Sequence, residues 1–273
     1  FQIAAKPVVR NGIQATGVSV DIQDAGHSRN FKDIRALLEN CALSDGVKSR
    51  SLAVFERLAR AEAAIHGCSL QEVHFHEVGG IDAIVDIVGT AIGLQLLAIQ
   101  DVVCAPLPLS AGMTRGSHGS IPLPAPATLQ ILAGHPVRNA DSDRELVTPT
   151  GAAIAATVAR FGPMPEMTID RTGYGVGGWD LEDRPNLLRG ILGQGPVETR
   201  RDREVFLDFG EVCDLDWLAV FEDIPAPTPE QEAPPLLARV LYDPYGQTHV
   251  ERGPELRLVE HDSAATVVGG ITQ

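Results

Sequence analysis

Two histidines and two aspartates lie close together between residues 72 and 89. His74 and His76 flank an apolar residue, and on a strand both imidazoles would project from one face. Asp82 and Asp86 follow a Gly-Gly turn and are four residues apart, which places them on one face of a helix. Neutral imidazole and carboxylate are ligands that suit nickel, zinc, iron or manganese. The spacing therefore predicts a transition-metal site built by a strand, a turn and a helix.

Other roles for these residues stay open at this point. Asp82 could be only a helix cap or a first-turn acid. Asp86 stands in an apolar helix, where we expect it to be buried and to need a partner or a metal. An H-x-H pair alone is a weak signal, and the segment lacks the second histidine of the helical zinc-protease motif.

Three further polar stretches could bind an anion. Residues 106–126 are rich in Gly and Pro and carry Arg115, which could clamp a carboxylate or phosphate, and His118. Residues 148–151 read as a helix start, whose small residues would let an anion approach. His27 and Arg29 precede another expected helix. The alternatives are a surface loop for the first stretch, plain helix capping for the second, and merely exposed side chains for the third.

Residues 173–178 match the pattern G-x-G-x-x-G, but the residues after them cannot open a helix. We therefore reject a dinucleotide site and expect a glycine-rich hinge or flap. The sequence also has no nucleophile elbow and no phosphate-binding P-loop.

Alternating helical and strand patterns predict an α/β fold, with α+β as the alternative, in which helices cover a sheet. The Asn11-Gly12 pair within residues 8–20 indicates a hairpin or a bent strand. We expect helices at 30–39, 50–65, 82–99, 125–132 and 150–161, and strands at 73–77, 101–105, 167–171 and 187–191.

Composition narrows the class of protein. The 273 residues carry 22 Lys and Arg against 36 Asp and Glu, a net charge of −14, and no basic block, so nucleic acid is a poor partner. No apolar run is long enough to span a membrane. Four scattered cysteines and no visible signal peptide favour a reducing, cytoplasmic setting. Because the chain starts at Phe1, we expect it to begin inside a longer one.

The last part of the chain differs from the rest. Residues 196–273 hold 16 acidic and 6 basic residues, −10 of the net −14, and 8 of the 19 prolines. The sequence predicts a metal- and substrate-binding α/β domain at 1–195 and an acidic, Pro-rich C-terminal region at 196–273.

Ordered motifs over residues 5–193 resemble those of the LarC-type nickel insertion proteins. They are His27-Ser-Arg29 with Asp33, residues 72–89 with both histidines and both aspartates, residues 122–128, residues 148–152 and Gly173-Tyr174-Gly175. The resemblance implies a nickel chelatase (cyclometallase, a lyase) that acts on pyridinium-3,5-bisthiocarboxylic acid mononucleotide. The product would be the nickel-pincer nucleotide cofactor of lactate racemase.

The resemblance also implies partners and a cofactor. In that family, insertion depends on CTP with a divalent metal such as Mg²⁺ or Mn²⁺, bound by a C-terminal domain. Family members open with an Asp/Gly/Ser-rich segment, which would precede Phe1. The apo-racemase or other cofactor-maturation proteins are expected as partners, and a homo-oligomer stays open.

Residue chemistry suggests roles within these segments. Ni²⁺ would bind His74, His76, Asp82, Asp86 and His27, and Glu77 or His118 would take the proton that leaves the pyridinium ring. A metal-dependent hydrolase and a non-catalytic nickel carrier are the rival functions. The substrate would be held by Arg115, Thr148, Thr150, Gly151, Tyr174 and Arg29.

Overall fold

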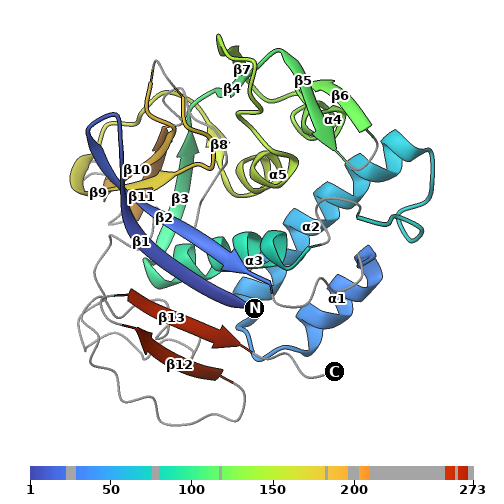
Figure 1. The fold of residues 1–273 in the computed structure, drawn as a ribbon, viewed down its shortest axis with the longest axis horizontal. Coiled ribbons are helices and arrows are strands. Elements are labelled where there is room, and N and C mark those ends of the chain that lie inside the picture. Colours follow the sequence, from blue (N-terminus) through green and yellow to red (C-terminus); the bar gives the residue numbers. More distant parts are fainter. Residues whose placement is uncertain are drawn as a thin grey trace.

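The structure is a computed structural model that describes residues 1–22, 29–75, 80–116, 119–181, 184–195, 203–208, 256–261 and 264–269. Within these ranges a long mixed sheet stands beside five helices (Figure 1). The mixed α/β class is thus confirmed.

The chain begins with the predicted hairpin, formed by β1 (Gln2–Arg10) and β2 (Ile13–Asp21). Its turn residues Asn11 and Gly12 have φ angles of 44° and 81°, the left-handed pair that a two-residue hairpin turn requires. The strands are paired over their whole length, from Gln2 opposite Asp21 to Arg10 opposite Ile13.

The hairpin belongs to a nine-stranded sheet of order β12-β13-β1-β2-β9-β10-β11-β3-β8. Pairing is parallel where β2 meets β9 and where β3 meets β11 and β8, and antiparallel elsewhere. The remaining strands of this sheet are β3 (Ile99–Cys104), β8 (Arg160–Phe161), β9 (Thr168–Val176), β10 (Leu187–Gln194), β11 (Arg203–Asp208), β12 (Leu256–His261) and β13 (Ala264–Gly269).

Two small strand pairs lie apart from this sheet. In the first, β4 (Leu107–Leu109) pairs in parallel with β7 (Val137–Asn139). In the second, β5 (Gly112–Gly116) forms a hairpin with β6 (Gly119–Leu123).

Polar side-chain caps set where three of the five helices begin. Asn30 and Asp33 form a capping box at α1, in which Asn30 Oδ1 accepts from the Asp33 amide at 2.8 Å. Ser44 caps α2, and Thr148 caps α5 by accepting from the Gly151 amide at 3.2 Å. The helices are α1 (Phe31–Asn40), α2 (Asp45–His66), α3 (Ile81–Leu96), α4 (Pro126–Ile131) and α5 (Pro149–Val158).

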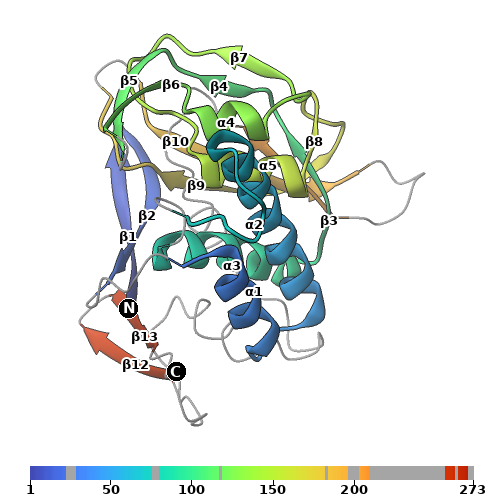
Figure 2. The ribbon, with the colours of Figure 1, turned by 90° about the vertical axis from the view of Figure 1, so that its right-hand side faces the viewer.

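The long helix α2 organises the helical side of the protein and contacts each of the other four helices. Figure 2, viewed from that side, shows the helices gathered in front of the strands. Phe55 of α2 packs on Phe75 with 6.3 Å between ring centroids, and Arg57 Nε donates to Thr157 Oγ1 of α5 at 3.1 Å. The apolar helix α3 is buried over most of its length and packs on β3.

Some predicted elements need correction. Residues 73–75 are not part of a sheet strand, because within the described part of the chain their strand-like pairing is a single bridge between Asn30 and His74. Helix α2 starts at Asp45 rather than residue 50, since Ser44 supplies the cap. The helix expected to reach residue 99 ends at Leu96, and the one expected to reach residue 161 ends at Val158. Their last expected residues begin β3 and form β8.

The sheet continues beyond residue 195, because β11 lies between β10 and β3. The division of the chain near that residue stays a prediction. Among the described helices, none combines the length and the apolar character that crossing a membrane would require.

Candidate functional site

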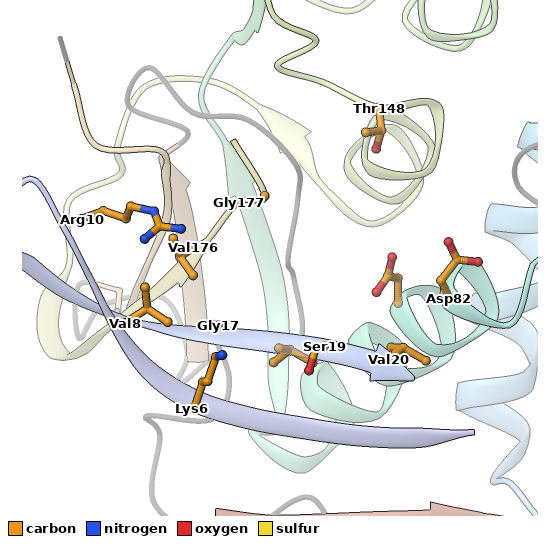
Figure 3. A pocket seen from close by; sticks show the side chains of 13 residues that line it. Lys6, Val8, Arg10, Gly17, Ser19, Val20, Asp82, Thr148, Val176 and Gly177 are labelled. Carbon is orange, nitrogen blue, oxygen red and sulfur yellow. The ribbon is translucent and has the colours of Figure 1, made fainter. Parts of the chain in front are cut away.

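A cavity of about 450 Å³ lies between the β1–β2 hairpin and the first turns of α3 and α5 (Figure 3). The hairpin forms one wall, and the end of β9 with Gly177 and Gly178 closes another part. Segments from four distant parts of the sequence therefore meet around one space.

The α3 side of the cavity is acidic. Asp82 and Asp86 both line it, as their spacing of four residues on one helix face predicts. Asp82 is exposed and Asp86 half-buried, so Asp86 is less buried than its apolar neighbours in sequence suggested. Two carboxylates one helical turn apart can hold a divalent cation, and the α3 N-terminus favours the negative charge of Asp82.

The hairpin side of the cavity is basic. Lys6 and Arg10 line it from β1, with Val8 between them on the same strand face. Figure 3 shows both cationic side chains at the end of the cavity away from Asp82. The cavity is thus polarised, with cations on the hairpin and carboxylates on α3.

Thr148 adds the start of a helix to the same cavity. Its hydroxyl oxygen accepts a hydrogen bond from the Gly151 N–H, and Pro149 follows at the first helical position. Thr150 and Gly151 lie in this first turn but not in the cavity wall, and Gly151 is buried.

The histidine segment reaches the structure only in part, because His76 and Glu77 lie outside the described residues. Val73 and Phe75 are buried and His74 is exposed, so the predicted alternation holds over these three residues. Phe75 N donates to Arg29 O at 3.4 Å, and the bridge between Asn30 and His74 joins the segments that carry the first two motifs.

The full metal site is not assembled by the described residues, in which no three His, Cys, Asp or Glu side chains gather around one point. His74 does not line the cavity. His27 and His118 also lie outside the described residues. The ligand set beyond Asp82 and Asp86 stays a prediction.

Besides Thr150 and Gly151, three more of the predicted substrate-binding residues do not line the cavity, namely Arg115, Tyr174 and Arg29. Arg115 is exposed on the β5–β6 hairpin. Tyr174 faces Arg189 across the β9–β10 pair, and Arg189 forms an ion pair with Asp208 of β11. Arg29 is half-buried just before α1, and its backbone carbonyl accepts from Phe75.

Sequence reasoning missed the residues that the hairpin contributes, chiefly Lys6, Arg10 and Ser19. A signal for the cations was present, since they are four residues apart on an expected strand and so share a face. Nothing in their local sequence showed that this face would meet α3. The rejection of a dinucleotide site fits the structure, because β9 is followed by a loop and β10 and not by a helix.

The fold and cavity define a mixed α/β protein whose cavity carries carboxylates from α3 and cationic side chains from β1. The sequence model of the family described as "Nickel insertion protein" matches residues 1–214, and the chain belongs to this family.

Individual relatives agree with the family. The chain is 48% identical over 218 residues to a "Putative nickel insertion protein" of Syntrophotalea carbinolica, covering 79% of this chain and 54% of the relative. A protein of the same description from Syntrophobacter fumaroxidans is 40% identical over 263 residues, or 92% of this chain and 68% of the relative. This second match extends into the region after residue 196.

A third relative, from Desulfitobacterium hafniense, is named "Pyridinium-3,5-bisthiocarboxylic acid mononucleotide nickel insertion protein". It is 44% identical over 195 residues, which cover 71% of this chain and 48% of the relative. The chain spans about half the length of the first curated relatives it matches. No solved structure matches it at a significant level.

Proposed function

We propose that this chain inserts nickel into pyridinium-3,5-bisthiocarboxylic acid mononucleotide, the compound in the name of the D. hafniense relative. Family membership supports the reaction, and one structural observation supports its location. Asp82 and Asp86 of α3 line the same cavity as Lys6 and Arg10 of β1, and Figure 3 shows Asp82 at the end away from the two cations. A cation cargo and an anionic nucleotide need opposite charges in one space.

In this proposal the carboxylates of α3 receive Ni²⁺ through oxygen atoms that exchange readily. We propose that histidines of the segments around residues 27 and 74–76 complete the set, although His74 itself does not line the cavity. The two thiocarboxylates of the substrate then replace protein ligands, because softer sulfur atoms compete well for nickel.

The last step forms a bond between nickel and the pyridinium carbon. The C–H bond breaks, its electron pair becomes the C–Ni bond, and the proton passes to a base, so nickel stays in the +2 state. Glu77 or His118 is proposed as that base. Both residues lie outside the described part of the chain.

CTP with Mg²⁺ or Mn²⁺ is a separate proposal that rests on the resemblance. The family places nucleotide binding after residue 195, and residues 209–255 of that region lie outside the described residues. The three described cysteines are free, which supports the expected cytoplasmic setting. Delivery to an apo-racemase, and a homo-oligomer, stay predictions.

The test is an insertion assay with purified chain, Ni²⁺ and the bisthiocarboxylic acid mononucleotide, each with and without CTP and Mg²⁺. Mass spectrometry should show a product heavier by one nickel and lighter by the displaced protons, formed only when protein is present. A nickel carrier would bind the metal without forming this product. Neither the family nor the relatives named above are described as hydrolases, and hydrolysis of the substrate without nickel uptake would contradict the proposal.

A further inference from the structure

We propose that Lys6 and Arg10 of β1 bind the phosphate of the substrate and so orient its pyridinium ring toward α3. This inference rests on the proposed function, because it assumes that the ligand of the cavity is a mononucleotide. It assigns the hairpin residues a role in substrate recognition.

The strand geometry brings the two cations to one end of the cavity. Lys6 and Arg10 share a face of β1, with Cα atoms about 13 Å apart on a strand, a gap that their two long side chains can close. Gly17 stands opposite Lys6 in the hairpin register and presents no side chain there. Figure 3 shows the ammonium group of Lys6 and the guanidinium group of Arg10 directed to the same end of the space.

Arg10 carries a hydrogen-bond donor that the described residues leave unused. Its Nε atom is buried and has no hydrogen-bond partner among them. The one ion pair that the described residues give Arg10 is with Asp180, whose Oδ1 atom is 4.0 Å from Nε and whose side chain is 78% exposed. Such an exposed pair contributes little, whereas a buried donor without an acceptor is costly. A phosphate oxygen at this end would accept from Nε and from a second guanidinium nitrogen.

The start of α5 is a weaker phosphate site, although it lines the same cavity. Pro149 has no N–H, and the Gly151 N–H already bonds to the Thr148 hydroxyl. Of the first three residues of the helix, only Thr150 can therefore offer an amide to a ligand. One amide with a helix dipole is less than two full positive charges.

The opposite end of the cavity repels a phosphate. Asp82 and Asp86 would stand against a second anion there, while they attract a nickel ion. The charge distribution thus favours one orientation, with phosphate on the hairpin and the thiocarboxylates and nickel at α3.

The experiment measures binding without insertion. Calorimetry compares the dicarboxylate analogue of the mononucleotide, in which oxygen replaces both sulfurs, with its dephosphorylated nucleoside. The proteins are the unmodified chain, Lys6→Met, Arg10→Gln, Arg10→Lys, and Lys32→Met as a control at an exposed lysine on α1. Circular dichroism checks that each variant is folded.

Lys6→Met and Arg10→Gln should each weaken mononucleotide binding by about tenfold or more, since each removes a charged hydrogen bond to phosphate. Their affinity for the nucleoside and for Ni²⁺ should stay within about twofold. Lys32→Met should bind the mononucleotide analogue as tightly as the unmodified chain does. Arg10→Lys, which keeps the charge but loses the planar guanidinium group, should bind it with an affinity between those of the unmodified chain and Arg10→Gln.

Equal weakening for both ligands, no weakening for either, or no binding of the mononucleotide by the unmodified chain would overturn the inference. If the phosphate-dependent loss appears but the insertion assay yields no product, the proposed reaction fails while the phosphate site stands. The two failures are therefore distinguishable.

Discussion

The carboxylate of Asp82 occupies the space that a side chain at Gly80 would need. A Cβ atom built on Gly80 would meet Asp82 Oδ1 well inside contact distance. Gly80 is the N-cap residue of α3 and, having no side chain, gives this helix no side-chain capping hydrogen bond. The absence of a Cβ therefore lets Asp82 fold back over the start of α3 at the edge of the cavity.

Replacing Gly80 by Ala should displace Asp82 and weaken nickel binding. The backbone angles at Gly80, φ −71° and ψ 164°, are open to alanine, so the fold should tolerate the change. We expect a stability cost of at most about 1 kcal/mol, since Ala is a poorer N-cap than Gly. Nickel affinity, measured by calorimetry, should fall.

A double-mutant cycle separates this effect from a general disturbance of α3. In an Asp82→Asn background, Gly80→Ala should leave nickel affinity unchanged, because the carboxylate it displaces is already gone. Additive losses would show that Gly80 acts through something other than Asp82.

Gly17 and Gly46 should respond to alanine with opposite signs. A Cβ at Gly17 would stand 3.0 Å from both Val176 Cγ1 and Val8 Cγ2, so Gly17→Ala should destabilise the protein by about 1–2 kcal/mol. A Cβ at Gly46 in α2 would meet only Gln95 Oε1 at 3.5 Å, so Gly46→Ala should stabilise by up to about 1 kcal/mol. Urea unfolding measures both, and equal signs would contradict the packing described at the hairpin.

Cys104 should be inert toward thiol reagents in the folded protein. Burial, and then the nearby Asp208 carboxylate, raise the pKa of the Cys104 thiol well above its ordinary value. Mass spectrometry after iodoacetamide treatment at pH 8 should find Cys104 unmodified and the half-buried Cys41 and Cys68 modified. Modification of all three at equal rates would show that β3 opens readily.

The same shift predicts a loss of stability at alkaline pH. The unfolded thiol ionises near pH 8.5, whereas the folded thiol stays protonated, so the unfolded state loses the proton first. The contribution of Cys104 to the free energy of unfolding is thus intact below about pH 8.5 and declines as the pH rises above that value. In a Cys104→Ala variant, the free energy of unfolding should fall less steeply between about pH 8.5 and pH 10 than in the unmodified chain. An equally steep fall in both proteins would contradict this prediction.

The lowered pKa of His135 predicts a second effect of pH on stability, at acidic pH. Burial, and then the positive charge of Arg57, lower the pKa of His135, whose ring packs on Phe161 with 5.0 Å between centroids. As the pH falls, His135 binds a proton near pH 6.5 in the unfolded state but only at a lower pH in the folded state. The free energy of unfolding therefore keeps the contribution of His135 above about pH 6.5 and loses it as the pH falls below that value. Urea unfolding between pH 7 and pH 5 should show a smaller decline for His135→Gln than for the unmodified chain.

Local periodicity was enough to predict the acidic side of the cavity. Asp82 and Asp86 share a face because a helix repeats every 3.6 residues, a relation that lies within five consecutive residues. The hairpin was likewise readable from Asn11-Gly12. Helix starts at Ser44 and Thr148 depend on single capping side chains, and only the second was recognised.

The basic side could not be predicted in the same way. Lys6 and Arg10 reach the cavity because β2 pairs with β9 and the helices stand beside that part of the sheet, which are long-range relations. His74 shows what a local pattern cannot predict. Its alternation with buried Val73 and Phe75 was correct, but the pattern could not reveal that, among the described residues, its strand-like partner is Asn30.

The most direct test of the account is a single-turnover insertion assay on the unmodified chain and on the double variant Asp82→Asn/Asp86→Asn, with Glu166→Gln as an exposed carboxylate control outside the cavity. Nickel affinity of the double variant should fall by more than about tenfold, the loss expected when a residue that only orients a metal ligand is replaced. The nickel-containing product should become undetectable. Glu166→Gln should insert nickel at the unmodified rate. A double variant that still forms the nickel product at the unmodified rate would contradict the assignment of this cavity as the place where nickel is inserted.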